Sequence, residues 1–279
     1  MIRIGLNTSC LQKRSNRGIR EILEFVFSHG FAALEYRDEY PFSERLTAED
    51  IHWARTEVEK RQLPCSLHLS FYDLNLSAFR EELRLAAIGS VLKSVRLARE
   101  LGATTATVHG GNLRLRYYGE EWKAKAEDLS IDSLRRILEE CERCGIWLLL
   151  ENLNLFRKNE HQVYSSPESM LRAAQALGGR IGFTLDVAHI VSLPMDVLRF
   201  VEIMGVERIG LAHLNDNDFG SDQHLAVGEG KIDYRGFIRA YLERGWSFPL
   251  LCETQTPEYA LASKLYLEAL IAELAPARA

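Results

Sequence analysis

The stretch RIGLAHLNDNDFGSDQHLAVGEG, from Arg208 to Gly230, passes from a short apolar run into a polar loop. Its eighteen residues from His213 onward hold two His, three Asp, one Glu and three Gly, so little of it can enter a hydrophobic core. Imidazoles and carboxylates that gather where a strand meets a loop are typical of a metal site for a polar substrate. Asn, Asp and Gly also form ordinary turns, so this stretch alone leaves a turn and a site equally open.

The composition of the whole chain is that of an ordinary globular enzyme. Its 279 residues are 47% hydrophobic and 26% charged, which suits a folded protein with a full core. A net charge of −5 argues against a dedicated nucleic-acid-binding protein, although local basic patches can override a global balance. We expect neither a leader peptide nor a membrane span, because Met1 to Ile4 already resembles a strand and no apolar run approaches ~20 residues. Five scattered Cys form no disulfide framework, so we expect a cytoplasmic protein with no membrane partner.

Strand-like runs alternate with helical patterns along the whole chain. The predicted strands cover residues 2–7, 32–36, 65–69, 104–109, 147–151, 181–186, 208–213 and 250–253, and the clearest predicted helices cover 47–61, 78–101, 129–144 and 257–274. This single alternation, without a linker, predicts one (β/α)8 TIM barrel of the α/β class over residues 1–279. A doubly wound sheet is the alternative. It would usually show a glycine-rich phosphate turn after the first strand, where this chain has Asn7, Thr8, Ser9 and Cys10.

Residues that can bind a metal stand where six consecutive predicted strands end, and three more follow in the adjoining loops. The strand-end residues are His68, His109, Glu151, Asp186, His213 and Glu253, and the loop residues are His189, Asp222 and His224. In a TIM barrel the active site lies at the C-terminal ends of the strands, so these side chains should converge. Buried carboxylates and imidazoles that converge need a compensating cation. Their mixture favours zinc, manganese, cobalt or iron(II) over magnesium alone.

The motifs in these strands and loops resemble those of the xylose-isomerase-like barrel superfamily. They are LHLS, TVHGG, LLLEN, TLDVAH, AHLND, DQH-x3-GEG and CET, and they keep the strand order over nearly the whole chain. The superfamily includes sugar and sugar-phosphate isomerases and epimerases, inosose dehydratases and the endonuclease IV type of abasic-site nuclease (AP endonuclease family 2).

The resemblance implies, as a first candidate, a metal-dependent sugar or sugar-phosphate isomerase or epimerase. One divalent ion, Zn or Mn, would then be held by four strand-end residues, Glu151, Asp186, His213 and Glu253. The ion would polarise a carbonyl while Glu151 and Glu253 move a proton on and off the neighbouring carbon. His189 would bind or orient the substrate and completes the catalytic set. The seventh loop departs from the ketose epimerases, because it offers Asp222 and His224 where they offer an Arg to the sugar.

The resemblance implies, as the alternative, a zinc-dependent abasic-site (AP) endonuclease of the endonuclease IV type, with DNA as its partner. Three zinc ions would share nine ligands, and each has a counterpart here: His68, His109, Glu151, Asp186, His189, His213, Asp222, His224 and Glu253. The fourth strand ends in His-Gly-Gly where these nucleases favour His-Pro-Gly. This departure and the acidic net charge favour the first candidate, whereas the intact pair Asp222 and His224 favours the second. A barrel that only binds a ligand ranks last, because so many ionisable groups are costly to keep without chemistry.

Basic residues gather in three loops expected at the same end of the barrel. These loops contain Lys13, Arg14 and Arg17, then Arg114 and Arg116, then Arg157 and Lys158. Such basic runs are often only solvated surface. At the active-site end of a barrel whose net charge is negative, they instead favour a small anionic or sugar substrate or a DNA backbone. The candidate substrate-binding residues are Arg114, Arg116, Arg157 and Tyr72, whose ring could stack on a sugar. A homo-oligomer is compatible with the sequence.

Overall fold

Eight parallel strands close into a barrel in the computed structural model, which describes residues 2–12, 17–114, 119–156 and 160–275. Around the barrel the strands follow the order β1, β10, β9, β8, β6, β4, β3 and β2. Their bounds are Ile4–Asn7 (β1), Leu34–Arg37 (β2), Cys65–His68 (β3), Thr105–Val108 (β4), Trp147–Glu151 (β6), Gly182–Asp186 (β8), Ile209–Leu214 (β9) and Leu250–Cys252 (β10). The predicted TIM barrel is therefore confirmed.

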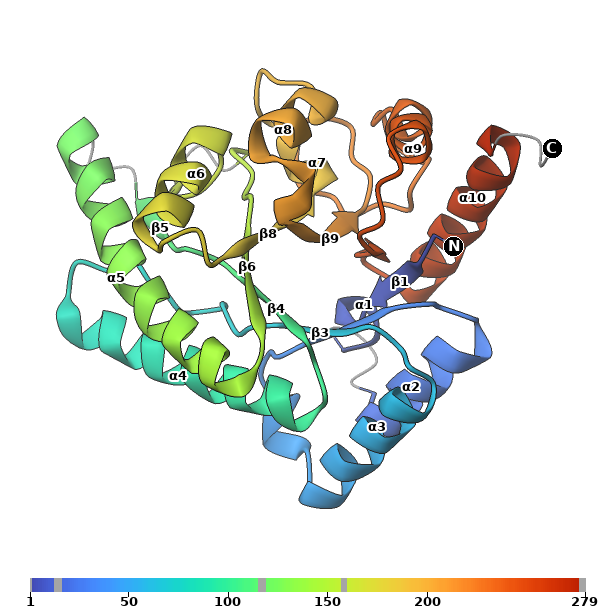
Figure 1. Cartoon of the computed structure of the whole chain (residues 1–279), viewed down its shortest axis with the longest axis horizontal. Helices are drawn as coiled ribbons and strands as arrows, with labels where there is room; N and C mark the ends of the chain where they lie inside the picture. Colours follow the sequence, from blue (N-terminus) through green and yellow to red (C-terminus); the bar gives the residue numbers. More distant parts are fainter. Residues whose placement is uncertain (1, 13–16, 115–118, 157–159, 276–279) are drawn as a thin grey trace.

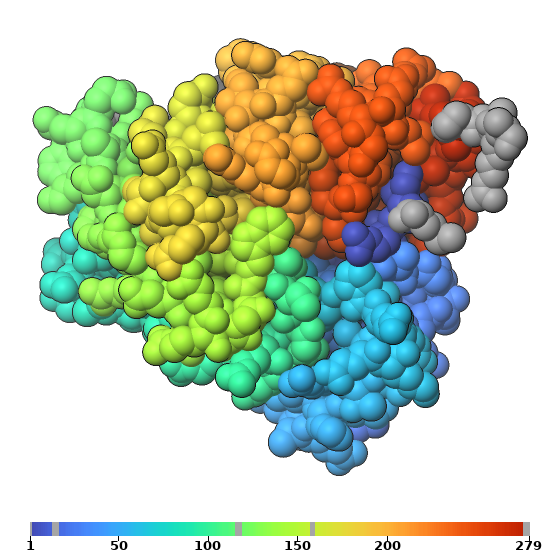
Figure 2. All heavy atoms as spheres, viewed as in Figure 1, coloured from blue at the N-terminus to red at the C-terminus, as the bar shows by residue number. Residues whose placement is uncertain are grey.

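Helices cover the outside of the barrel (Figure 1). Their bounds are Ser9–Gln12 (α1), Ile19–Ser28 (α2), Ala48–Lys60 (α3), Glu81–Glu100 (α4), Glu120–Cys144 (α5), Pro167–Ala176 (α6), Val187–Ile190 (α7), Val197–Met204 (α8), Tyr234–Glu243 (α9) and Pro257–Leu274 (α10), with short 3-10 turns at Ser43–Arg45 and Val206–Arg208. In the space-filling view the dark-blue N-terminal segment lies against the red helix α10 (Figure 2), which packs on β1. Within the described residues, none of the helices combines the length and hydropathy that a membrane span needs.

One helix and one pair of short strands differ most from the sequence prediction, and both features lie beside the mouth of the barrel, the end where the strands have their C-termini. Helix α5 begins at Glu120 rather than near residue 129. Its first turns are polar, so they carry no apolar repeat, but two acidic residues there interact favourably with the helix dipole. An antiparallel pair, β5 (Asn112–Arg114) and β7 (Glu160–Gln162), was not predicted at all. Its strands have only three residues each, too few for an alternating pattern to be recognised.

The interior of the barrel is layered along four of its strands, β2, β6, β9 and β10. A small apolar cluster, separate from the main core between strands and helices, consists of Ala33, Leu149, Leu211 and Leu251. Because side chains of a strand alternate between its two faces, the residue two positions further along points into the barrel as well. Those residues are Glu35, Glu151, His213 and Glu253, so each apolar side chain supports a polar one nearer the mouth. We call the apolar cluster the plug.

The plug leaves no room at Gly5 of β1, which gives a first prediction. A Cβ atom at Gly5 would lie 2.4 Å from Leu251 Cδ2 and 2.7 Å from both Cβ and the carbonyl oxygen of Ala33. We expect Gly5→Ala to lower the free energy of unfolding by about 1–3 kcal/mol, the usual cost of overpacking a core. The matched control is Gly89→Ala in helix α4, where nothing lies within 4 Å of the added atom. That change should raise the free energy of unfolding by about 0.5–1 kcal/mol. Denaturant midpoints measure both, and equal midpoints for the two variants would contradict the packing argument.

Candidate metal centre

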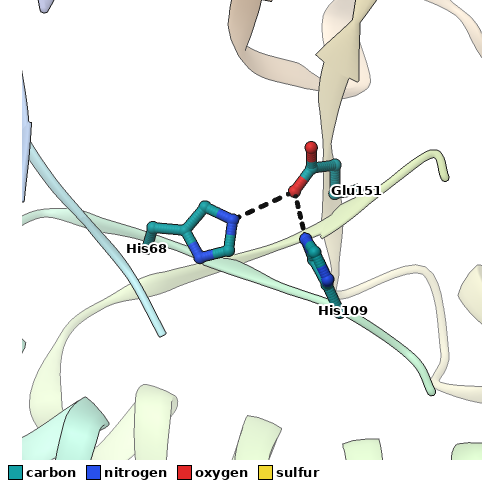
Figure 3. A group of neighbouring side chains, drawn as sticks. All are labelled: His68, His109 and Glu151. Carbon is teal, nitrogen blue, oxygen red and sulfur yellow. Dashed lines mark hydrogen bonds and ion pairs between the residues drawn. The ribbon is translucent and has the colours of Figure 1, made fainter. Parts of the chain in front are cut away.

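A first group of possible metal ligands consists of His68, His109 and Glu151, whose side chains point toward one another (Figure 3). They stand at or just beyond the ends of β3, β4 and β6. The Nε2 atoms of His68 and His109 lie 3.2 and 2.8 Å from Glu151 Oε2. Nδ1 of His68 lies 3.1 Å from the Leu69 carbonyl oxygen, to which it can only donate. In neutral His68 the lone pair is therefore on Nε2, which faces Glu151.

A second group of possible metal ligands consists of Glu151, Asp186, His213 and Glu253. All four are buried, and one possible ligand atom from each lies within 4.8 Å of those of the others. Nδ1 of His213 lies 3.2 Å from Glu151 Oε1 and 3.1 Å from Glu253 Oε2. The Oδ2 atom of Asp186 is buried and has no hydrogen-bond partner. Glu151 belongs to both groups, because its Oε2 faces the first and its Oε1 faces the second.

A third group, His189, Asp222 and His224, lies beside the second. Asp222 is close to both imidazoles, with Oδ2 3.5 Å from His189 Nε2 and Oδ1 3.4 Å from His224 Nε2. The two Nδ1 atoms donate to backbone carbonyls, His189 to Asn152 and His224 to Glu253, both at 2.8 Å. In each neutral ring Nε2 is thereby left with its lone pair toward Asp222. The structure thus brings all nine predicted ligands together in three adjoining groups.

The buried carboxylates and imidazoles of these groups shift one another's pKa values. Burial raises the pKa of Glu151, but His109 and His213 outweigh it and hold that pKa well below the usual carboxyl range. Burial lowers the pKa of His213, but the Glu35 and Glu253 carboxylates outweigh it and raise that pKa well above its usual value. A proton on the His213 imidazole therefore compensates the buried carboxylates, as a cation would.

The pKa values of Asp186 and Asp222 shift in opposite directions, because nearby imidazoles outweigh the effect of burial at Asp222 but not at Asp186. Burial raises the pKa of Asp186 to about 6, and the nearby Glu151 and Glu253 add to the rise. Burial also raises the pKa of Asp222, but the adjacent His189 and His224 outweigh it, so that pKa lies below its usual value. A buried carboxylate oxygen without a hydrogen-bond partner, as Asp186 Oδ2 is, within a set of oxygen and nitrogen ligand atoms, fits a divalent cation. The residues present therefore suit a metal of the zinc or manganese type.

A cavity of about 540 Å³ opens above the three groups. Glu151, Glu253 and His189 line it from below, and Tyr72 and Arg114 are part of its wall. The β5–β7 pair forms one side through Asn112, Arg114, Glu160 and Gln162. Of the predicted substrate contacts, Tyr72 and Arg114 thus reach the cavity, while Arg116 and Arg157 lie outside the described residues.

Two charged residues of β2 belong to the centre and were not predicted. Glu35 is fully buried and lies 2.6 Å from Nε2 of His213. Arg37 places Nη1 2.7 Å from Glu253 Oε1, and its guanidinium lies 4.7 and 5.5 Å from the ring centroids of Phe71 and Tyr72. A signal was present, because Leu34-Glu-Tyr-Arg37 carries two charges at alternate positions of a strand that a barrel buries on both faces.

Comparison with known proteins places most of the chain in one group. The family described as "Xylose isomerase-like TIM barrel" matches residues 23–273. An uncharacterized protein of Methanocaldococcus jannaschii is 26% identical over 88% of this chain and 82% of its own length. Probable endonuclease 4 of Mycobacterium ulcerans is 26% identical over 71% of this chain and 75% of its own. Fructoselysine 3-epimerase of Shigella flexneri is 24% identical over 74% of each chain.

Solved structures share the fold along the whole length. A D-tagatose 3-epimerase-like protein superimposes with a TM-score of 0.84 at 22% identity and covers 98% of both chains. A Thermus thermophilus protein whose crystal was soaked with zinc chloride gives a TM-score of 0.76 at 23% identity and covers all of both chains. At these identities the likeness establishes the barrel alone.

Proposed function

Because the chain belongs to the xylose isomerase-like TIM barrel family, we propose that it is a metal-dependent sugar or sugar-phosphate isomerase or epimerase. One observation carries the proposal: two buried carboxylates, Glu151 and Glu253, border the same cavity and share one group of possible metal ligands. The cavity volume lies within the range of about 300–1,000 Å³ that is usual for small-molecule sites. The similarity to a fructoselysine 3-epimerase supports the substrate class.

The two carboxylates are suited to move a proton between two carbons or two faces of one carbon. Imidazoles hold Glu151 ionised, and the Arg37 guanidinium at 2.7 Å favours the ionised form of Glu253. An ionised carboxylate can take a proton from a carbon next to a carbonyl. Once protonated, the same group can return that proton to the neighbouring carbon, or the other carboxyl, after taking a proton from solvent, can deliver it to the opposite face while the first keeps the proton it removed. A divalent ion bound by Glu151, Asp186, His213 and Glu253 would polarise that carbonyl and make the neighbouring C–H more acidic.

The remaining side chains of the cavity have roles in binding the substrate under this proposal. Nε2 of His189 faces the centre and would orient a sugar hydroxyl. Arg114 would bind an anionic end, such as a phosphate, and the half-exposed ring of Tyr72 would pack on the sugar. The substrate is accordingly a sugar or a small sugar phosphate, and the centre would bind one to three zinc or manganese ions.

The first and third groups favour a second candidate, hydrolysis of a phosphodiester in abasic DNA. A single-ion epimerase does not need His68, His109, Asp222 or His224 as ligands, yet they are arranged for ligation. Closely spaced ions can activate a water molecule and stabilise the attacking and leaving oxygens at phosphorus. The similarity to a probable endonuclease 4 agrees with this activity.

Asp222→Asn should separate the two candidates. The isomerase keeps the four-residue group, so exchange of substrate hydrogen for solvent deuterium should stay within about tenfold of the wild type. A three-metal hydrolase loses a ligand, so incision should fall by roughly 10–100-fold. Proton NMR of a panel of ketoses and ketose phosphates measures the exchange, and gel analysis of an abasic duplex measures incision.

The matched control is Asp218→Asn, an exposed carboxylate of the same loop outside the three groups. It should leave both readouts unchanged. Metal content by mass spectrometry completes the comparison. Three zinc ions for each chain, together with incision and no deuterium exchange in any sugar, would overturn the isomerase proposal in favour of the hydrolase.

A further inference from the structure

We infer that Glu35 is a positioning residue that makes Nδ1 of His213, rather than Nε2, the metal-binding nitrogen. Glu35 lies inside the barrel on β2 and belongs to none of the three ligand groups. Its Oε2 is 2.6 Å from Nε2 of His213, on the side of the ring that faces away from Glu151 and Glu253. The inference rests on the metal site of the proposed function, which both candidate reactions require.

Four donors surround the Glu35 carboxylate. Oε2 lies 2.7 Å from Asn7 Nδ2 and 2.6 Å from His213 Nε2, while Oε1 lies 2.7 Å from Thr107 Oγ1 and 3.1 Å from Ser66 Oγ. The orientation of Asn7 is independently determined, because its Oδ1 accepts from the backbone N–H of Ser9 at 3.0 Å. Its amide nitrogen must therefore face Glu35 and donate. With both oxygens engaged, Glu35 acts as an ionised acceptor.

This acceptor determines the tautomer of His213. Nε2 has to carry a proton in order to bond to Glu35, so in the neutral ring the lone pair is on Nδ1. Nδ1 is the nitrogen that lies 3.2 Å from Glu151 and 3.1 Å from Glu253, among the possible metal ligands. Glu35 therefore holds the ring in the one state in which His213 can complete the second group.

Three other imidazoles of the ligand groups also have one nitrogen bonded outside the site, but in these rings that nitrogen is Nδ1. His68, His189 and His224 each donate Nδ1–H to a backbone carbonyl and present Nε2 to the centre. For His213 the partner is a side chain that carries a full negative charge, which makes the opposite nitrogen a stronger donor to a metal. A substitution at Glu35 can remove this hydrogen bond to His213, whereas a substitution cannot remove the backbone carbonyl to which the other three imidazoles donate.

Glu35→Gln tests the inference by metal affinity alone. Gln presents one oxygen acceptor and one N–H donor group, so it can face Nε2 of His213 with a donor and favour the wrong tautomer. We expect zinc affinity, measured by competition with a chromophoric chelator, to fall by roughly 10–100-fold. Ser66→Ala removes a bond to the other oxygen and should lower affinity by less than about threefold. Glu140→Gln, which removes a buried carboxylate paired with Arg96 on the outer helices, should not change it.

Nitrogen-15 NMR of histidine-labelled wild-type protein loaded with zinc provides the second measurement. We expect His213 to carry its proton on Nε2 and to bind zinc through Nδ1. Zinc on Nε2 would overturn the inference even if the Glu35→Gln variant does not fold. An affinity of Glu35→Gln within threefold of the wild type would overturn it too. Absence of zinc binding by the wild type would instead count against the proposed metal-dependent function, so the two failures are distinguishable.

Discussion

Replacing Glu151 with Gln should lower kcat by about three orders of magnitude while the barrel remains folded. The variant keeps the shape of the side chain but can no longer accept a proton, and acid–base catalysis contributes roughly 10²–10⁴-fold to an enzymatic rate. Glu151 is also the residue on which the centre converges, since its two oxygens face His109 and His213 in different groups. The loss should therefore appear in kcat at saturating metal and not only in the affinity for the ion.

The measurement is deuterium exchange or product formation at saturating zinc or manganese, with circular dichroism to confirm the fold. The matched control is Glu160→Gln, a carboxylate in the wall of the same cavity but outside the three ligand groups. We expect the control to stay within about tenfold of the wild type. Turnover retained in Glu151→Gln would remove this residue from its catalytic role.

Removing the metal with a chelator should lower the melting temperature by about 5–10 °C. An ion that binds only the folded chain stabilises it by about 2.7 kcal/mol when its free concentration is 100 times its dissociation constant. For a chain of this size each kcal/mol shifts the melting temperature by about 2–4 °C. The physical source is the centre itself, where Glu151, Asp186 and Glu253 are buried close together and a cation relieves their repulsion.

Calorimetry with and without zinc or manganese measures this shift. Asp186→Asn tests where the ion binds, because it removes the carboxylate whose buried Oδ2 has no hydrogen-bond partner. The metal-dependent shift should fall to less than half in that variant. Equal melting temperatures of the wild type in chelator and in zinc would contradict a resident metal ion in this centre.

The barrel and the convergence of the candidate ligands could be predicted from the sequence because both follow from local patterns. Strands such as Trp147–Glu151 are nearly all apolar until their last residue, and a TIM barrel gathers such last residues at one end. That these side chains bind a metal and carry catalysis stays a prediction, since the structure shows their proximity rather than their chemistry.

Other features depend on contacts between distant segments and could not be predicted in the same way. Glu35 lies two residues before the end of β2, and only the closed barrel places it against His213, 178 residues away. The β5–β7 pair joins two strands from different loops, and strands of three residues are too short to show an alternating pattern in the sequence. Arg37 was not predicted because the prediction at the strand ends rests on residues that can bind a metal, and the guanidinium group of Arg has no free lone pair for one.

The layering of the barrel interior also separates two engineering tasks in the strands that carry the plug. Leu149, Leu211 and Leu251 of the plug fill the interior of the barrel, and the residue two positions later in each strand belongs to a group of possible metal ligands. Substitutions at Glu151, His213 or Glu253 leave this apolar support in place. Because side chains of a strand alternate between its two faces, two positions in one short segment can be substituted separately. One position would be used to change the stability of the barrel, and the other to change the candidate metal site.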